Sequence, residues 1–284
     1  MTEELLLHPL TEKRIAEVVS KPPHALLITG VAGIGKALIA EQIAIKLLGF
    51  TGTAIDPKTY KFISSDTQSI SIDEVREMEH FLSLRVPGKN AINRVIIISD
   101  SQKLTSEAQN ALLKTLEEPP SGTLLILTAR HQTELLDTIR SRVQIFDVTK
   151  PSNAQLKAYF SNQGYVTKDI QTALAMSGGL PGLMRALLTN DDHPIQEAAL
   201  LARKLLTSSR FDRLREVEAL AKKKELALDV LDIMKQMANV SLRTSQQPKT
   251  EYWRQILEAD DYARNAIHRN AQLKLTLSDF VMKL

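Results

Sequence analysis

Residues 30–40 read GVAGIGKALIA, and this stretch decides the fold of the first half of the chain. It has the Gly-x4-Gly-Lys spacing of a phosphate-binding P-loop, and it directly follows the apolar run ALLIT (25–29). A glycine-rich turn between a strand and a helix points backbone amides at phosphate oxygens, and the helix N-terminus strengthens the attraction. The predicted nucleotide-binding residues of this loop are Gly30, Gly33, Gly35, Lys36 and Ala37.

The predicted P-loop lacks one ligand for a metal ion. Ala37 stands where P-loops carry a Ser or Thr whose hydroxyl binds Mg²⁺. Lys36 can still reach the outer phosphates as a point charge. The loop is therefore expected to be able to hold ATP without hydrolysing it, with Mg²⁺ bound weakly or not at all.

A carboxylate is also missing at the end of a predicted strand, where residues 96–101 read IIISDS. ATPases of this class end that strand with Asp-Glu, the Asp for the metal shell and the Glu for positioning water. In one register Ser99 replaces the Asp and Asp100 replaces the Glu. In the other register Asp100 is the metal-binding Asp and Ser101 replaces the Glu.

Either register leaves the chain one carboxylate short, because a shift of one residue turns a strand side chain to the opposite face. Asp100 therefore cannot serve both purposes. The loss of a general base alone slows a reaction by roughly 10²–10⁴-fold, so hydrolysis by this chain itself is not expected.

Short apolar runs alternate with helical patterns up to residue 148, which predicts a parallel sheet covered by helices. The predicted strands are residues 25–30, 59–63, 94–99, 123–129 and 143–148. The predicted helices between them are residues 36–48, 72–82 and 106–117. Ser71 with Glu74 has the spacing of a capping box, and Thr105 is a predicted N-cap.

After residue 148 only helical patterns follow, so the predicted fold class is α/β plus all-α. The predicted domains are an α/β domain at 1–150, a small helical lid at 151–191 and a helical domain at 192–284. The basic run AKKKE (221–225) is expected on the solvated face of a helix. Glu117 and Glu118 are interpreted as a helix end before two prolines, because adjacent helical positions do not face each other.

The composition of the chain excludes several classes of site. Among its 284 residues there is no cysteine, and the six histidines show no metal-ligand spacing, so no metal site is predicted. The net charge of +3 permits contact with nucleic acid without arguing for it. No apolar run approaches about 18 residues, and the acidic start MTEELLLHPL lacks the features of a secretory signal. A cytoplasmic location is expected.

Four segments together carry a resemblance to a known family. They are SISIDEVREMEHFLSL (69–84), NALLKTLEEPP (110–120), TIRSRV (138–143) and RNAQLKLTLSDFVMKL (269–284). The chain resembles the clamp-loader family of AAA+ proteins over nearly its whole length. Ser141 and Arg142 match the Ser-Arg-Cys motif of this family, with Val143 in place of the Cys.

The resemblance implies an AAA+ P-loop fold, a helical lid and a C-terminal helical collar that holds a heteropentamer together. It implies gamma/tau-type and delta subunits as partners, and contact through the complex with a sliding clamp and primer-template DNA. Arg142 would reach the ATP of a neighbouring subunit as an arginine finger. No membrane partner is implied.

The departures from the family pattern favour a non-motor subunit. The family often has a four-cysteine zinc module after the P-loop helix, and residues 49–62 contain no cysteine, so no zinc is expected. Gly182 stands where the lid normally carries a sensor arginine, and Arg185 lies about one helical turn further on. The alternative interpretation is an active motor subunit of the gamma/tau type, with a degenerate P-loop and Asp100 as its remaining carboxylate.

Overall fold

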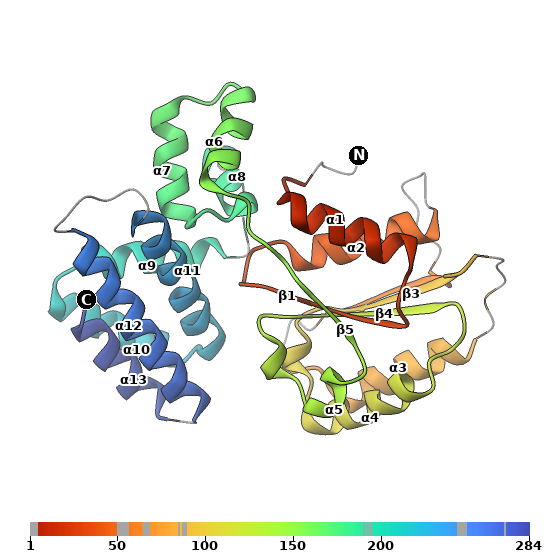
Figure 1. Ribbon diagram of the computed structural model, residues 1–284. Coiled ribbons are helices and arrows are strands. Elements are labelled where there is room, and N and C mark those ends of the chain that lie inside the picture. Colours follow the sequence, from red (N-terminus) through yellow and green to blue (C-terminus); the bar gives the residue numbers. More distant parts are fainter. Residues whose placement is uncertain are drawn as a thin grey trace. The chain divides into compact units, whose positions relative to one another are not determined.

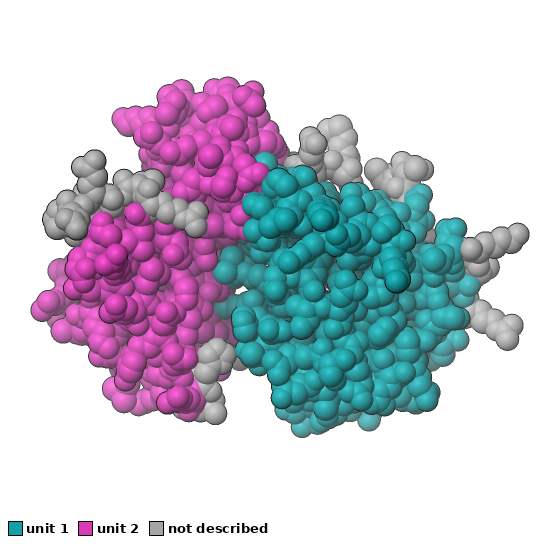
Figure 2. Space-filling model, viewed as in Figure 1, with its two compact units in different colours: residues 1–149 teal, residues 150–284 magenta. Residues whose placement is uncertain are grey.

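The computed structural model of the chain divides into two compact units, Met1–Thr149 and Lys150–Leu284 (Figure 2). It describes residues 5–49, 57–64, 69–84, 86, 90–189, 191, 193, 195–242, 249–269 and 271–284. The boundary between the units lies within one residue of the predicted end of the α/β domain. The further division predicted between residues 191 and 192 stays a prediction, because the second unit contains both predicted parts.

The first unit is built on a five-stranded parallel sheet with the strand order β2-β3-β4-β1-β5 (Figure 1). The strands are β1 Ala25–Thr29, β2 Tyr60–Ile63, β3 Arg94–Ile98, β4 Thr123–Ala129 and β5 Gln144–Asp147. The five predicted strands are confirmed to within one residue at each end. Because all strands are parallel, their carboxyl ends lie along one edge of the sheet and their amino ends along the other.

Helices cover both faces of this sheet (Figure 1). On one face lie α1 Pro9–Ser20 and α2 Lys36–Leu48. On the other face lie α3 Ile72–Ser83, α4 Ser106–Glu117 and the short α5 Asp137–Arg140. Two single 3-10 turns, Ser101–Lys103 and Gln132–Glu134, follow β3 and β4.

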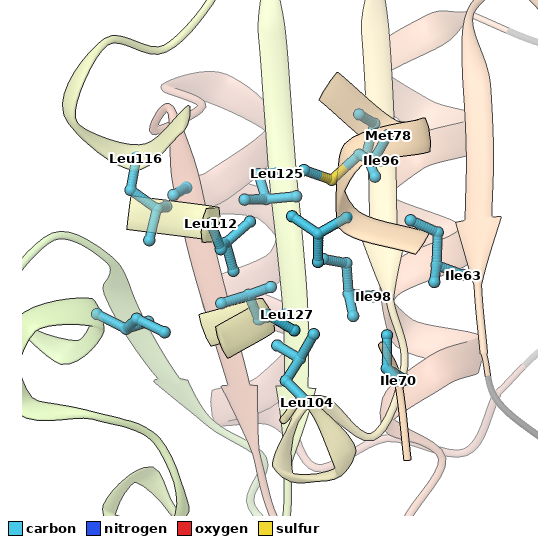
Figure 3. Packing of buried hydrophobic residues seen from close by; sticks show 14 of the residues in the cluster. Ile63, Ile70, Met78, Ile96, Ile98, Leu104, Leu112, Leu116, Leu125 and Leu127 are labelled. Carbon is cyan, nitrogen blue, oxygen red and sulfur yellow. The ribbon is translucent and has the colours of Figure 1, made fainter. Parts of the chain in front are cut away.

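Strand alternation divides the apolar side chains between two cores. Ile96 and Ile98 of β3 contribute to the core under α3 and α4, which Figure 3 shows from close by. Val95 and Ile97 contribute to the core under α1 and α2. The sheet is therefore buried on both faces, as its nearly continuous apolar strands indicate.

The predicted helix caps are confirmed. The backbone N–H of Ser71 donates to Glu74 Oε2 (2.7 Å), which is half of the capping box at the start of α3. The hydroxyl of Thr105 accepts a hydrogen bond from the N–H of Ala108 (3.2 Å) at the start of α4. Helix α4 ends at Glu117, just before the two prolines, as expected.

Among the described residues, the second unit consists of helices and the segments that connect them, without a strand. Its helices are α6 Asn153–Asn162, α7 Thr167–Ser177, α8 Pro181–Thr189, α9 Gln196–Thr207, α10 Arg210–Leu220, α11 Lys224–Leu242, α12 Lys249–His268 and α13 Leu273–Met282. Helix α7 packs against α11 as well as α6 and α8. No helix among the described residues combines the length and apolar character needed to cross a lipid bilayer.

The prediction that residues 221–225 lie on one helix is wrong. This basic run forms the turn between α10 and α11, and only its last two residues are helical. Leu220 and Ala227 on either side are buried, so the turn allows each helix to direct its own apolar face inward.

Gly178 ends α7 in a left-handed conformation (φ +59°) and lies directly against α11. A Cβ at this position would lie 2.4 Å from the Cβ of Gln236 and 2.9 Å from its backbone carbon. We expect Gly178→Ala to lower the free energy of unfolding by about 2–4 kcal/mol, through backbone strain and overpacking. Urea unfolding of the purified chain measures this.

The matched control for this variant is Gly164→Ala. Gly164 is also left-handed (φ +89°), but a Cβ there would meet nothing within 4 Å. Its expected loss of stability is only about 1 kcal/mol. Equal losses in the free energy of unfolding for the two variants would show that the close contact of Gly178 with α11 adds nothing to the cost of a Cβ.

Candidate functional site

The P-loop follows the carboxyl end of β1 and leads into α2, which begins at Lys36. Gly35 is the N-cap of α2 with φ +91°, and Gly33 has φ +74°. Side chains other than glycine rarely adopt these left-handed conformations. The loop thus has the backbone shape, as well as the glycine spacing, of a phosphate-binding turn at a helix N-terminus.

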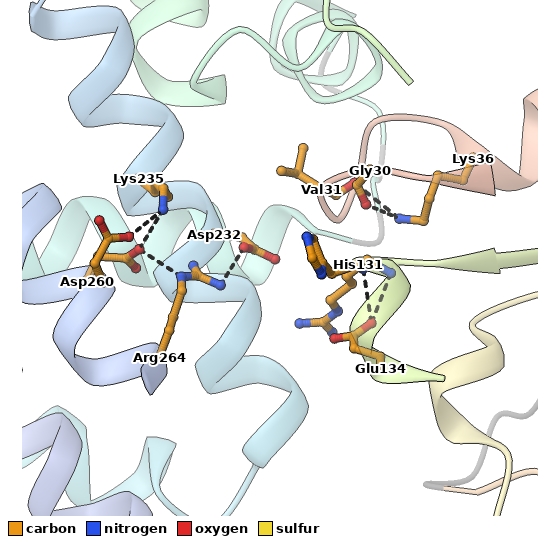
Figure 4. A network of polar contacts seen from close by, with 11 residues as sticks. Gly30, Val31, Lys36, His131, Glu134, Asp232, Lys235, Asp260 and Arg264 are labelled. Atoms are coloured by element: carbon orange, nitrogen blue, oxygen red, sulfur yellow. Dashed lines mark hydrogen bonds and ion pairs between the residues drawn. The ribbon is translucent and has the colours of Figure 1, made fainter. Parts of the chain in front are cut away.

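The side chain of Lys36 contacts the backbone of its own P-loop. Its side chain is buried, with the residue only 8% exposed. The ammonium Nζ donates to the carbonyl oxygens of Gly30 (2.9 Å) and Val31 (3.2 Å), as Figure 4 shows. A bound phosphate would have to exchange for these two carbonyl contacts before the ammonium could serve it.

The residues around the loop fit a phosphate better than they fit a magnesium ion. The first residue after Lys36 is Ala37, which offers no oxygen to a metal. Within the described ranges, no group of three or more His, Asp or Glu side chains is arranged to hold a metal ion. Backbone amides and one ammonium suit an anion, whereas Mg²⁺ requires oxygen ligands.

The end of β3 shows where the two candidate carboxylate positions lie. Alternation along Val95, Ile97 and Ser99 places Ser99 on the side of the sheet that carries α2. Ser101 is fully buried and donates its hydroxyl to the carbonyl oxygen of Ile98 (3.0 Å), so it cannot position water. Of the two registers, the first, in which Ser99 replaces the metal-binding Asp, is the one that puts this position on the same side of the sheet as α2, the helix that follows the P-loop.

Asp100 leaves the strand in a left-handed conformation (φ 51°, ψ 52°). It is the one residue other than glycine with positive φ among the described residues. Its backbone N–H donates to the hydroxyl of Thr128 (3.0 Å), and its Oδ1 accepts from Gln102 Nε2 (3.3 Å). Thr128 lies at the end of β4, between β3 and β1, so these contacts fix the turn at the edge that carries the P-loop.

Arg142 lies at the opposite edge of the sheet from this P-loop. Its carbonyl oxygen accepts a hydrogen bond from Nε2 of His24 (2.9 Å), which immediately precedes β1, whereas the P-loop follows the last residue of β1. The five residues of β1 separate the two places, a distance of roughly 16 Å at about 3.3 Å per residue. The structure therefore does not bring Arg142 together with the P-loop of its own chain.

The guanidinium of Arg142 is held by contacts within the first unit. Its Nη1 donates to the carbonyl oxygen of Thr138 (2.9 Å) and to the hydroxyl of Ser141 (3.2 Å). Its Nη2 forms an ion pair with Oε1 of Glu117 (2.8 Å), the last residue of α4. The side chains of Arg142 and Glu117 remain 36% and 53% exposed, so the held guanidinium still faces solvent.

Two side chains of this region are not identified by the sequence pattern. Glu117 and Glu118 indicate only a helix end, although Glu117 pairs with Arg142. Gln109 is buried and bridges two segments, donating Nε2 to the carbonyl oxygen of Leu104 (3.3 Å) and accepting from the N–H of Leu136 (3.0 Å). The available signal for Gln109 was its amide next to the apolar face of α4.

Comparisons of the sequence point to proteins of DNA replication. The family model described as "DNA polymerase III, delta subunit" matches residues 53–152, a span that contains Asp100, Glu117 and Arg142 but not the P-loop. The chain is 29% identical over 210 residues to DNA polymerase III subunit delta' of Escherichia coli, which covers 67% of this chain and 62% of that protein.

A second relative comes from an archaeon. The chain is 31% identical over 148 residues to the replication factor C small subunit of Halobacterium salinarum, covering 51% of this chain and 43% of that protein. The chain thus spans less than two thirds of the length of the curated relatives it matches.

Comparison of the fold leads to an AAA+ protein. The match to a solved variant of RuvB from Thermotoga maritima covers 99% of this chain and 87% of the other, with a TM-score of 0.50 and 14% identity. At this identity the likeness concerns the fold alone, and it agrees with the predicted AAA+ architecture. By sequence the chain is similar to DNA polymerase III delta-prime subunits and to a replication factor C small subunit, and its fold resembles that of RuvB.

Proposed function

We propose that this chain is a non-motor subunit of a clamp loader, which provides Arg142 to ATP bound by a neighbouring subunit. The observation that carries the proposal is the position of Arg142, oriented by its own chain at the edge of the sheet opposite the P-loop. An arginine so placed can serve a nucleotide only in another molecule. Its partners would be gamma/tau-type and delta subunits and, through them, a sliding clamp and primer-template DNA in the cytoplasm.

The chemistry of the proposed role is electrostatic. Phosphoryl transfer spreads negative charge over the equatorial oxygens of the transferred group. A planar guanidinium with several N–H donors matches this charge better than an ammonium does. Arg142 would act on the neighbour's triphosphate in this way. The P-loop of its own chain would take no part in this contact.

The P-loop of this chain itself has a separate, non-catalytic role in this proposal. Its amides and Lys36 bind the phosphates of ATP, and Ala37 and Ser99 leave the metal without two of its usual protein ligands. ATP bound here would therefore persist, because neither the metal nor the attacking water is held. Asp100 belongs to this site, which does not hydrolyse ATP, and it takes no proton from water.

We expect the isolated chain to show ATP turnover no greater than background, and Ala37→Thr to leave that turnover unchanged. Restoring one hydroxyl at residue 37 does not restore the carboxylate that Ser99 lacks. The measurement is phosphate release, combined with ATP titrations in the presence and absence of Mg²⁺. Removing Mg²⁺ should leave the affinity of the wild-type chain for ATP unchanged.

The matched variant for this test carries Ala37→Thr together with Ser99→Asp. It should gain Mg²⁺-dependent ATP affinity, because both metal ligands are then present on the α2 side of the sheet. Turnover well above background in the wild-type chain, or its rise in the single Ala37→Thr variant, would instead indicate a gamma/tau-type motor with a degenerate P-loop.

A further inference from the structure

We propose that Glu117 is the positioning residue of Arg142, and that it sets the orientation of the guanidinium without blocking it. This inference rests on the proposed function of Arg142 and adds a second residue to that site. Glu117 itself would not touch the neighbour's nucleotide. Its carboxylate would act through the arginine alone.

The first support is the number of N–H donors that remain. An arginine side chain has five N–H donors. The contacts of Arg142 within the described residues use two on Nη1, for Thr138 and Ser141, and one on Nη2, for Glu117. One donor on Nη2 and the donor on Nε are left, which is the number that a bidentate contact with phosphate needs.

The second support is the rigidity of the element that carries Glu117. Helix α4 is capped at its start by Thr105 and stops at Glu117 ahead of Pro119. The buried amide of Gln109 ties this helix to the N–H of Leu136, just before α5. Glu117 and the Thr138 carbonyl thus contact the guanidinium from two elements that are themselves joined, so they orient it relative to the sheet.

The third support is the exposure of the pair, which distinguishes positioning from inhibition. Both side chains are more than a third exposed. An ion pair in contact with water is weak and readily exchanged. A triphosphate carries more negative charge than one carboxylate, so Glu117 cannot retain the guanidinium against it. What the carboxylate provides is a reduced range of side-chain conformations before the nucleotide arrives.

The test uses the chain assembled with a partner ATPase of the clamp-loader type, and compares Glu117→Ala, Glu117→Gln and Glu118→Ala. Glu117→Ala should lower kcat at the partner's site by about tenfold, with KM for ATP unchanged, because misplacing a catalytic group by about 1 Å can reduce rate by up to 10². Glu117→Gln keeps an oxygen acceptor of the same reach and should retain most of the rate. Glu118→Ala, the neighbouring exposed glutamate, should behave as the wild type.

A double variant separates positioning from a general loss of structure. In the background of Arg142→Ala, adding Glu117→Ala should cause no further fall in kcat, because the residue through which Glu117 acts is gone. A further fall of similar size would mean that Glu117 acts independently of Arg142, and would overturn the inference.

The same set of variants distinguishes failure of the inference from failure of the proposed function. If Arg142→Ala leaves the partner's turnover unchanged, the arginine-finger role is wrong and the inference is wrong with it. If Arg142→Ala lowers turnover and Glu117→Ala does not, only the role of Glu117 is wrong. A rise in turnover with Glu117→Ala would show that the carboxylate restrains the arginine, which also contradicts positioning.

Discussion

Arg142→Ala is expected to lower ATP turnover of the assembled complex by about 10³-fold at the site that the arginine serves. The size follows from removing a planar cation from the transition state of phosphoryl transfer, where no water molecule can replace its directed charge. Arg142→Lys should recover little of the loss, because an ammonium keeps the charge and loses the fork of donors. Single-turnover kinetics of the reconstituted complex give the rate at the affected site.

The folded state should tolerate this substitution. The pair between Arg142 and Glu117 is partly exposed, and such pairs contribute at most about 1 kcal/mol. A suitable control is Arg76→Ala, which removes another partly exposed arginine of the same unit, paired with Asp73 on α3. Turnover that is equal in the wild type, Arg142→Ala and Arg76→Ala would exclude the proposed role.

A buried ionic cluster in the second unit carries the other large expected effect (Figure 4). Arg264 of α12 contacts Asp260 (Nε to Oδ2, 2.7 Å) and Asp232 of α11 (Nη1 to Oδ1, 2.9 Å). Asp260 is completely buried, and Lys235 bridges it at 3.6 Å to the exposed Asp261 at 2.7 Å. Burial raises the pKa of Asp260, against the opposing effect of the Arg264 and Lys235 charges, so desolvation is the larger influence on this carboxyl.

Arg264→Ala is therefore expected to lower the free energy of unfolding by about 3–5 kcal/mol. The substitution removes the cation that contacts both of the largely buried carboxylates, Asp232 and Asp260, and leaves Asp260 with only the more distant Lys235 as a cationic neighbour in this cluster. Chemical denaturation of the purified chain measures the loss. Asp261→Asn is the matched control, because Asp261 is 63% exposed and pairs with the same cluster, and its expected cost is below about 1 kcal/mol.

Replacing the whole cluster by apolar residues should lower the free energy of unfolding much less than Arg264→Ala does. A variant with Asp232→Leu, Asp260→Leu and Arg264→Met has no buried charge left without a partner, and apolar replacements of buried ion pairs are often neutral or stabilising. A loss for Arg264→Ala below about 1 kcal/mol would contradict this account, because a loss of that size is typical of an exposed pair.

The sheet and its helices could be predicted from the sequence because their signals are local. Apolar runs gave the five strands, and Ser71 with Glu74 gave the start of α3. Helix α1 was not predicted, although Thr11, Ile15 and Val18 are buried at helical spacing and Pro9 begins the helix. The turn at residues 221–225 could not be predicted, because it depends on which faces of α10 and α11 meet other helices.

The candidate site could be predicted only where one residue type carries the chemistry. The glycine spacing and Ala37 indicated a P-loop without its metal hydroxyl, and TIRSRV indicated Arg142. The pairing of Arg142 with Glu117 could not be predicted, because the two residues come from different elements and meet only in the fold. The register at Ser99 and Asp100 also needed the structure, since the apolar run before them is continuous.

The placement of one arginine and one P-loop at opposite edges of the same sheet has a consequence for assembly. Contacts that join one edge of a subunit to the other edge of the next are heterologous, so they give a row of subunits with a direction. In such a row every boundary between subunits unites unlike edges. Under the proposed function, a member whose P-loop does not hydrolyse ATP would leave one boundary without a reaction, and the number of active boundaries would fall below the number of subunits.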